Sequence, residues 1–369
     1  MESLFLDRDF WRGRRVLLTG HTGFKGAWTA LWLRRLGANV FGLALPPEDP
    51  SLYRLLGLES EISSHYVDLS DVAGVRAAVR DARPQMALHM AAQALVPRSL
   101  EDPAATFATN VVGTVNVLQA LRDAPDLKAI LVITSDKVYA DEGADRAHRE
   151  GDRLGGLDPY SASKAACEIA TASMADSFLR RAGVRVATAR GGNVVGGGDF
   201  SPERLVPDIA RAAVAGQTLT LRRPNATRPW QHVLDCVSGY LSYLVALDRG
   251  LNLPNALNFG PRGARGKTVA ELAEALQSAF GAGDGWVFRP EAQSRERQTL
   301  AIDSRLARAT LNWRDCLTGD EMVASIAEWY GAWGRGEDAR ALSLRQIEDW
   351  ETRFEAASRP PGQLRTSAG

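Results

Sequence analysis

The chain has 369 residues, of which 45% are hydrophobic, and its 44 lysine and arginine residues balance 44 aspartate and glutamate residues. A chain of this length and composition is expected to form roughly two domains around a sizeable core. Because no net charge attracts polyanions, we expect no nucleic-acid partner, although a local basic cluster could still hold a nucleotide.

The sparse cysteines and histidines exclude the usual metal and redox motifs. Cys167, Cys236 and Cys316 lie far apart, and none of the five histidines has metal-ligand spacing, so we expect no metal. Residues 1–15 lack the apolar run of a secretion signal, and no stretch approaches the roughly 20 apolar residues of a membrane helix. These features predict a cytoplasmic globular protein without a membrane partner.

Short apolar runs alternate with helical patterns along the first half of the chain, which is typical of a parallel sheet covered on both faces. The expected strands are Val16–Thr19, Val40–Leu43, His65–Val67, Met86–Met90, Ile130–Ser135 and Val186–Arg190. The expected helices are Gly26–Leu36, Val72–Asp81, Ala104–Arg122 and Tyr160–Arg181. This order predicts an α/β fold with a Rossmann-like doubly wound parallel sheet.

The pattern becomes less regular after Arg190. Helices are expected at Arg204–Ala215, Val233–Leu247, Lys267–Phe280 and Met322–Trp333, and extended segments at Thr218–Leu221, Ala256–Phe259 and Trp286–Arg289. We therefore predict a dinucleotide-binding domain, 10–190 with 228–260 returning to it, and a smaller C-terminal substrate-binding domain, 191–227 and 261–335. The composition of 358–369 predicts a loose tail.

The first expected strand runs directly into a glycine-rich turn, Thr19-Gly20-His21-Thr22-Gly23-Phe24-Lys25-Gly26, with GxxGxxG spacing. Glycine permits a tight turn, close approach of a diphosphate and close helix–strand packing, while a helix N-terminus favours negative charge. Because strand, turn and helix follow in order, we predict dinucleotide binding by Gly20, Thr22, Gly23, Phe24, Lys25 and Gly26.

The sequence indicates less clearly which dinucleotide is bound. The second strand lacks both the acidic residue that usually holds an adenosine ribose and the arginine that meets a 2′-phosphate, and we expect NAD. Asp68, followed by Leu69, is a candidate for adenine binding or a helix N-cap. After the fourth strand we expect cofactor contacts from Ala91, Ala92 and Gln93.

The run Tyr160-Ser161-Ala162-Ser163-Lys164 places a tyrosine and a lysine four residues apart at the start of an expected helix, so both share one face. A phenol has an ordinary pKa of about 10, and a nearby ammonium favours the phenolate. The phenolate can then take a hydroxyl proton while hydride leaves the same carbon. Together with the glycine turn and Ser135, this pair predicts a hydride-transfer site.

These motifs resemble the extended short-chain dehydrogenase/reductase superfamily and, within it, the CDP-glucose 4,6-dehydratase group. The resemblance covers most of the chain and rests on the motifs at 20–26 and 155–164 together with His-Met-Ala-Ala-Gln (89–93), Thr-Ser-Asp-Lys-Val-Tyr (134–139), Gly-Asn-Val-Val-Gly-Gly-Gly-Asp-Phe (192–200) and Arg-Pro-Trp-Gln-His-Val (228–233). It implies a hydro-lyase that uses NAD to convert CDP-glucose into CDP-4-keto-6-deoxyglucose.

The resemblance also implies roles for the catalytic residues. Tyr160 would take the C4 hydroxyl proton, and Ser135 would contact that hydroxyl or the tyrosine. Asp136 would be the acid for the C6 hydroxyl, provided that burial raises its pKa. Lys137, where dTDP-glucose dehydratases carry glutamate, would be either the C5 base or an electrostatic support for the enolate. The alternative for Asp136 and Lys137 is a surface ion pair.

Several residues are candidates for the substrate. The resemblance assigns Asn193 to the sugar diphosphate, and the guanidinium of Arg228 suits phosphate oxygens. Trp230 could shape the base or sugar pocket, or could belong to the core. The full set of expected substrate contacts is His89, Asn193, Arg204, Arg228, Trp230 and His232, with Arg295 as a weaker candidate.

Some features depart from the family pattern or leave rivals open. Pro97, the acidic loop Asp141–Arg153 and Phe200 differ from the expected residues, which puts the exact sugar or nucleotide in doubt. A 4-epimerase or reductase would keep the Tyr–Lys pair without needing Asp136 and Lys137, and a non-catalytic NAD-binding protein commonly loses the pair. The resemblance further implies a homodimer through a four-helix bundle of the Ala104–Arg122 and Tyr160–Arg181 helices.

Overall fold

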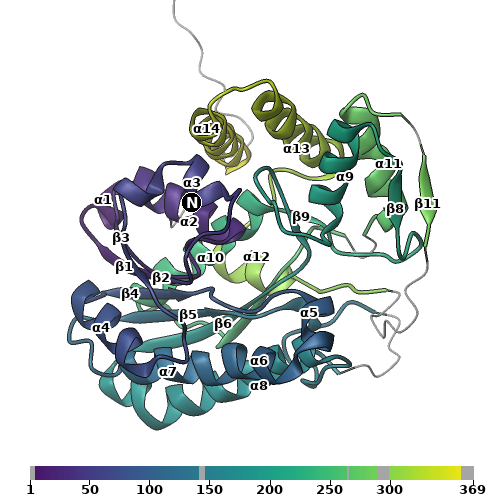
Figure 1. The fold of residues 1–369 in the computed structure, drawn as a ribbon. Helices are drawn as coiled ribbons and strands as arrows, with labels where there is room; N and C mark the ends of the chain where they lie inside the picture. The colour runs from purple at the N-terminus through teal and green to yellow at the C-terminus, as the bar shows by residue number, and fades with distance from the viewer. Residues whose placement is uncertain (1–4, 141–145, 264–265, 284, 290–298, 359–369) are drawn as a thin grey trace, which may run out of the picture.

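The computed structural model describes residues 5–140, 146–263, 266–283, 285–289 and 299–358. At its centre lies a seven-stranded parallel sheet with the order β10-β6-β5-β4-β1-β2-β3 (Figure 1). Its strands are β1 (Arg15–Thr19), β2 (Asn39–Ala44), β3 (Ser63–Tyr66), β4 (Met86–His89), β5 (Ala129–Ile133), β6 (Arg185–Gly191) and β10 (Ala256–Phe259). The predicted Rossmann-like doubly wound sheet is confirmed.

The central strands are continuous apolar runs because helices cover both faces of the sheet. Every residue of β5 is buried. Two core clusters, one on each face, divide the helices between them (Figure 1). The covering helices are α2 (Phe24–Leu36) and α10 (Val233–Asp248) on one face, and α4 (Val72–Ala82), α7 (Gly113–Leu121) and α8 (Pro159–Met174) on the other.

Two of the expected long helices contain π-helical turns. The segment expected as Ala104–Arg122 consists of α6 (Pro103–Phe107), a π-helical turn over Ala108–Val112, and α7. The segment expected as Tyr160–Arg181 continues from α8 into a π-helical turn over Ala175–Leu179. A π-helical turn changes the direction in which side chains point and often marks a functional site.

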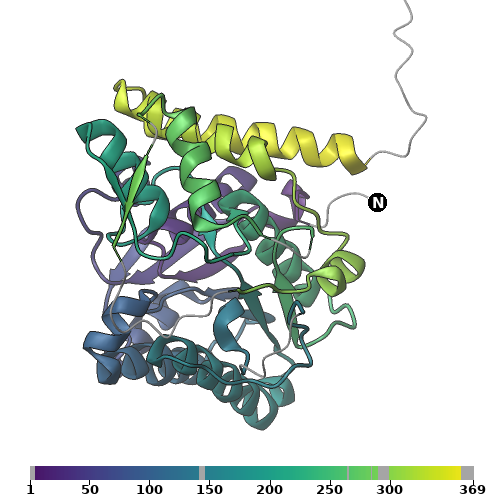
Figure 2. The same cartoon turned by 90° about the vertical axis from the view of Figure 1, so that its right-hand side faces the viewer.

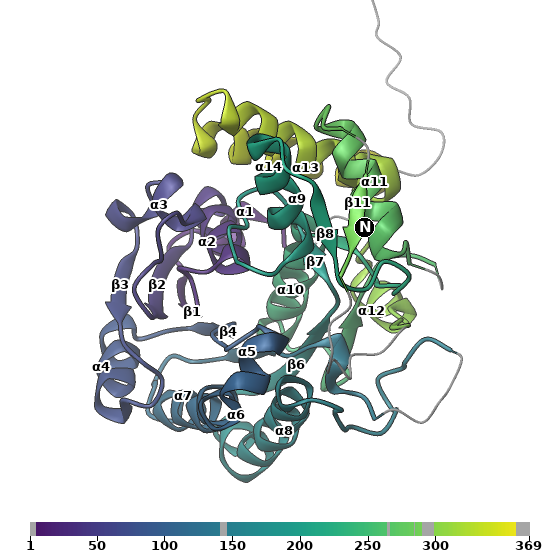
Figure 3. The same cartoon turned by 45° about the vertical axis from the view of Figure 1, so that its right-hand side comes forward.

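A second group of elements gathers beside the main sheet (Figure 3). Its helices are α9 (Leu205–Ala215), α11 (Val269–Ala279) and α13 (Gly319–Gly334), and short parallel pairs join β8 (Leu219–Leu221) to β11 (Trp286–Phe288) and β7 (Val194–Val195) to β9 (Gln231–His232). Shorter helices are α1 (Arg8–Trp11), α3 (Leu52–Leu55), α5 (Val96–Glu101) and α12 (Arg305–Leu311). The division into two domains stays a prediction.

The long helix α14 (Ala339–Ser358) fell outside both expected domains, yet it belongs to the fold (Figure 2). It returns to the N-terminal half, where the indole nitrogen of Trp32 donates to Glu351 Oε1 at 2.9 Å. Trp350 packs edge-on against Trp32 with 5.1 Å between ring centroids. Residues 359–369 of the expected tail lie outside the described residues. Within the described part of the chain, no helix has the length and apolar character to cross a membrane.

Candidate active site

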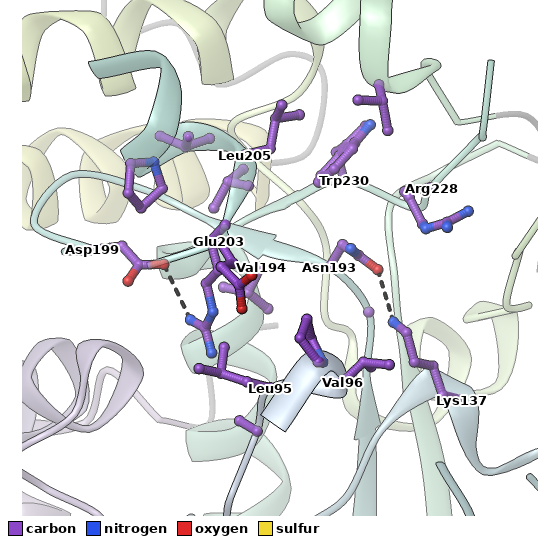
Figure 4. A pocket seen from close by; sticks show the side chains of 18 of the residues that line it. Leu95, Val96, Lys137, Asn193, Val194, Asp199, Glu203, Leu205, Arg228 and Trp230 are labelled. Carbon is purple, nitrogen blue, oxygen red and sulfur yellow. Dashed lines mark hydrogen bonds and ion pairs between the residues drawn. The ribbon is translucent and has the colours of Figure 1, made fainter. Parts of the chain in front are cut away.

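A cavity of about 320 Å³ opens where β5 and β6 end, between the main sheet and the elements around α9 (Figure 4). The side chains that line it come from the glycine turn, the segment after β5, the start of α8, the loop after β6 and the region from α9 to β9. The carboxyl ends of parallel strands are where ligands bind in doubly wound folds. The cavity is therefore the candidate active site.

The glycine turn has the close packing that a dinucleotide fold needs. Gly20 has φ +74°, and a Cβ there would lie 2.8 Å from the amide nitrogen of Ala91. A Cβ on Gly26 would lie only 2.0 Å from the carbonyl oxygen of Gly20. Helix α2 begins after Gly23, which makes no side-chain cap, so the first-turn N–H groups can receive an anion. These features fit a dinucleotide diphosphate.

Other expected cofactor residues surround this turn. Thr22 Oγ1 donates to the Leu45 carbonyl at 3.0 Å. Asp68 accepts from the Ser70 amide at 2.8 Å, which lowers the pKa of its carboxyl group. The N-cap of α4 is Asp71, so the capping alternative for Asp68 is wrong. The adenine contacts of Asp68 and of its neighbour Leu69, whose side chain is buried, stay predictions.

Tyr160 and Lys164 occupy the first two turns of α8, as expected. The helix is capped by Asp158, whose Oδ1 accepts from the Ser161 amide at 2.9 Å. Lys164 Nζ donates to the Ile133 carbonyl of β5 at 3.0 Å, and burial lowers the pKa of its ammonium. The lysine therefore ties α8 to the end of a central strand.

Burial raises the pKa of Tyr160. The charges of Lys137 and Arg204 and a hydrogen bond with Ser135 lower the pKa of the phenol, and the charge of Asp136 raises it. The ammonium of Lys164 donates to a backbone carbonyl, and its support of the phenolate stays a prediction.

Ser135, Asp136 and Lys137 form a compact turn after β5. The Ser135 hydroxyl donates to Asp136 Oδ1 at 3.1 Å and accepts from the Lys137 amide at 3.2 Å. Asp136 is 1% exposed, and its Oδ2 has no hydrogen-bond partner among the described residues. Lys137 Nζ lies 3.5 Å from Asp136 Oδ1 and donates to Asn193 Oδ1 at 3.3 Å (Figure 4). The surface ion pair considered above is wrong, because the carboxyl group is buried inside the cavity wall.

Basic side chains gather on the far side of the cavity. Arg204 is paired with Asp199 at 3.1 Å, and Arg228 is almost fully buried beside Trp230 (Figure 4). The Trp230 indole donates to the Lys267 carbonyl at 2.9 Å while its ring lines the cavity. Two further arginines, Arg222 and Arg223, also line it and were not identified from the sequence. The electrically neutral chain thus contains a local basic cluster that suits a diphosphate.

Two histidines expected to contact the substrate lie in the core instead. His89 is 2% exposed, with Nδ1 2.7 Å from Thr19 Oγ1 and Nε2 2.9 Å from Thr114 Oγ1. His232 is fully buried, and its Nδ1 caps α10 by accepting from the Leu234 amide at 3.2 Å. Burial lowers the pKa of each imidazole to about 3, so both are neutral at pH 7. Both substrate assignments are therefore corrected to structural roles.

The residues after β4 depend on an asparagine that was not predicted. Asn110, in the π-helical turn, accepts from the Gln93 amide at 2.8 Å and donates to Ser163 Oγ at 2.9 Å. Ser163 in turn donates to the carbonyl of Tyr160 at 2.7 Å. Asn110 thereby links the stretch that contains Ala91, Ala92 and Gln93 to the catalytic helix. A helical distortion of this kind leaves no signal in apolar periodicity.

Lys25 occupies an unexpected place for a glycine-turn residue. Its side chain lines the cavity, with Nζ 5.7 Å from the ring centroid of Tyr240, and burial lowers the pKa of the ammonium. Phe24 lines the same wall. Among the described residues, no group of three or more His, Cys, Asp or Glu could hold a metal ion. Arg295 lies outside the described residues.

Residues 16–260 match the model of the NAD dependent epimerase/dehydratase family. The chain belongs to this family. It is 39% identical over 352 residues to a CDP-glucose 4,6-dehydratase of Salmonella typhimurium, an alignment that covers 94% of this chain and 98% of the relative. The residues that line the glycine turn and the cavity lie almost wholly within the part of the chain that matches the family model.

Solved structures of this epimerase/dehydratase family share the fold. The UDP-glucose 4-epimerase of Thermus thermophilus with NAD is 25% identical, with a TM-score of 0.73 over 86% of this chain and 99% of that one. A dTDP-glucose 4,6-dehydratase of Bacillus anthracis with NAD is 19% identical, with a TM-score of 0.73 over 93% of this chain and 100% of that one. NAD is the cofactor of the family, and the close-packed glycine turn accommodates it.

Proposed function

We propose that the protein is an NAD-dependent CDP-glucose 4,6-dehydratase, a hydro-lyase that forms CDP-4-keto-6-deoxyglucose. The observation that carries the proposal is the buried Asp136, whose free Oδ2 lies in a cavity wall beside Lys137 and Tyr160. Elimination of water needs an acid for the leaving hydroxyl, which an epimerase does not need. The 39% identity to a curated CDP-glucose 4,6-dehydratase supports the same substrate.

The residues divide the chemistry between them. Tyr160, aided by Ser135 and Lys137, accepts the proton of the C4 hydroxyl. When bound, NAD would accept the hydride from C4 and return it to C6. The resulting 4-ketone acidifies the C5 proton. Elimination transfers that proton to the neutral amine of Lys137 while protonated Asp136 gives its proton to the C6 hydroxyl, which leaves as water.

The contacts of Lys137 bear on both of its expected roles. Its ammonium lies between two oxygen acceptors, on Asp136 and Asn193, at 3.5 and 3.3 Å. Such surroundings support a cation, whereas a base must carry a neutral amine. We therefore propose that Lys137 supports the phenolate as an ammonium during C4 oxidation and takes the C5 proton only after it has lost a proton of its own.

The basic cluster receives the nucleotide part of the substrate in this proposal. Arg228, Arg204 and Arg222 line the cavity, and guanidinium groups bind phosphate oxygens bidentately. The aromatic face of Trp230 supplies an apolar wall for the base or the sugar. Asn193, which bonds to Lys137, also lines the cavity and suits the sugar diphosphate.

The first experiment is incubation of the protein with CDP-glucose and NAD in deuterated water, followed by mass spectrometry and proton NMR. The expected product has lost water, carries deuterium at C5 and shows a new C6 methyl signal. UDP-glucose and dTDP-glucose serve as matched controls for the nucleotide. Recovery of unchanged CDP-glucose would contradict the substrate assignment, and inversion at C4 without loss of water would instead establish an epimerase.

We also propose that the enzyme is a cytoplasmic homodimer. Helices α6 and α8 and the two π-helical turns beside them expose large apolar side chains, with Phe107 38%, Val112 54%, Ile169 62% and Phe178 41% exposed. These helices lie side by side on one face of the molecule (Figure 1). Two copies of this surface would form the four-helix bundle implied by the family resemblance.

A further inference from the structure

A buried ion pair lies directly behind the catalytic residues. Glu168 and Arg190 are each 5% exposed, and their side chains meet at two points, Nε to Oε1 at 3.0 Å and NH2 to Oε2 at 2.9 Å. Neither residue lines the cavity, and the chemistry proposed above does not use either of them. The pair therefore needs a separate explanation.

Both oxygens of the Glu168 carboxylate accept hydrogen bonds, from the residue that follows β5 and from two residues of β6. Thr134 Oγ1 donates to Oε1 at 2.5 Å, and Thr188 Oγ1 donates to Oε2 at 2.7 Å. Together with the two bonds from Arg190, each carboxylate oxygen accepts two hydrogen bonds. A carboxylate with four donors in fixed positions has one orientation.

These contacts attach to the segments that carry the catalytic groups. Thr134 immediately precedes Ser135, Glu168 lies one helical turn beyond Lys164 on α8, and Arg190 immediately precedes Gly191 in the cavity wall. Arg190 NH1 also donates to the hydroxyl of Tyr139 at 3.0 Å, on the far side of the Ser135–Lys137 turn. The pair thus joins α8 to the ends of β5 and β6.

Stability alone is a weak reason for such a pair. The free energy needed to remove two charges from water is about as large as the attraction gained between them. Proteins in which apolar residues of similar volume replace a buried ion pair are often equally stable. Catalysis, by contrast, is sensitive to placement, since a shift of about 1 Å in a reacting group can cost on the order of 100-fold in rate. Catalysis therefore requires that the first turns of α8 keep their position relative to the ends of β5 and β6 to within about 1 Å.

We propose that Glu168 and Arg190 are positioning residues, which set the distance between helix α8, with Tyr160 and Lys164, and the strand ends that carry Ser135, Asp136 and Lys137. They do not touch the substrate or the cofactor. Loss of the pair lowers kcat by misalignment of the proton-transfer groups, while the basic cluster that binds the substrate keeps its geometry.

The test compares E168Q with the double variant E168Q/R190M and rests on the turnover of CDP-glucose proposed above. Both variants are expected to lose about 10- to 100-fold in kcat, with KM changed by no more than about threefold. E168Q leaves Arg190 as a buried charge without its partner, whereas the double variant removes both charges and regains thermal stability. A merely structural pair would regain kcat together with stability in the double variant, and that result would overturn the proposal.

A matched control comes from Arg14 and Asp248, a partly buried ion pair at 3.1 Å that lies away from the cavity. D248N is expected to have a lower melting temperature than the wild type. Its kcat is expected to equal that of the wild type when the two proteins are assayed well below both melting temperatures. If E168Q and E168Q/R190M do not fold, the T188V variant provides the test instead, because it removes one hydrogen bond to Glu168 and changes no charge. A several-fold lower kcat in T188V supports the proposal, and an unchanged kcat overturns it. An inactive wild-type enzyme would instead contradict the proposed function.

Discussion

At the scale of single residues, the contrast between Asp136 and the two core histidines shows how environment decides chemistry. Each lies in one of the motifs that carry the family resemblance. Asp136 points one carboxyl oxygen into the cavity wall without a partner, whereas both nitrogens of His89 are hydrogen-bonded in the core. A side chain acts on a ligand only when it has an unused donor or acceptor within reach of that ligand.

The substitution Asp136→Asn tests the acid role. An amide of the same size keeps the contact with Ser135 but donates no proton to the leaving hydroxyl, so dehydration is expected to fall by about 10²–10⁴-fold. Oxidation at C4 continues, and the reduced cofactor cannot return its hydride to C6. The measurement is a single-turnover experiment that follows NADH absorbance and product formation together.

The two outcomes of that experiment differ in kind. Accumulation of NADH with little product locates the defect at elimination, after C4 oxidation. A normal rate of product formation in D136N would contradict the acid role. Failure to reduce NAD would place Asp136 in the first step, with Tyr160. A melting curve that matches the wild type is the control for folding.

At the scale of elements, local rules explain the glycine turn and the helix that carries Tyr160 and Lys164. A strand, a turn that requires glycine and a helix N-terminus are encoded within about a dozen neighbouring residues, so the sequence predicts them directly. The π-helical turn at Asn110 is different, because it depends on contacts with Gln93 and Ser163 from other segments. Those contacts have no counterpart in a local pattern.

The proposed homodimer can be tested by a substitution on the outer surface of α8. Ile169→Glu places a charge where two copies of this surface are proposed to bury apolar side chains, and burial of an unpaired charge is strongly unfavourable. The variant is expected to be a monomer by size-exclusion chromatography with light scattering, whereas the wild type is a dimer. Val214→Glu, on an 86% exposed residue of α9, is the matched control and stays dimeric. A monomeric wild type would contradict the proposal.

At the scale of the whole molecule, a buried carboxyl group adds to the contacts that hold the last helices to the core. Asp235, on the first turn of α10, accepts from the Trp350 indole and the Cys316 amide at 2.7 Å each, and from the Leu317 amide at 3.1 Å. It is fully buried, and burial raises its pKa to about 7 in spite of these hydrogen bonds. Asp235 therefore couples the docking of α14 to pH.

The direction of the pH effect follows from proton binding. Unfolded Asp235 has an ordinary pKa of about 3.9, so between about pH 4 and 7 the folded state binds the additional proton. The contribution of Asp235 to the free energy of unfolding is full below about pH 4 and is lost as the pH rises through about 7. Asp235→Asn cannot ionise, so its denaturant midpoint is expected to fall less over this range than that of the wild type. Identical pH slopes for the two proteins would contradict this assignment.

The alternating strands and helices, the glycine turn and the Tyr160–Lys164 pair could be predicted from the amino-acid sequence. Each of these depends on apolar periodicity or on spacing within one or two turns, which neighbouring residues encode. The roles of Ser135, Asp136 and Lys137 were predicted from the family resemblance instead. The burial of His89 and His232 in the core and the packing of α14 on the N-terminal half could not be predicted from the sequence. Burial and contacts between residues far apart in the sequence are set only by the packing of the whole chain.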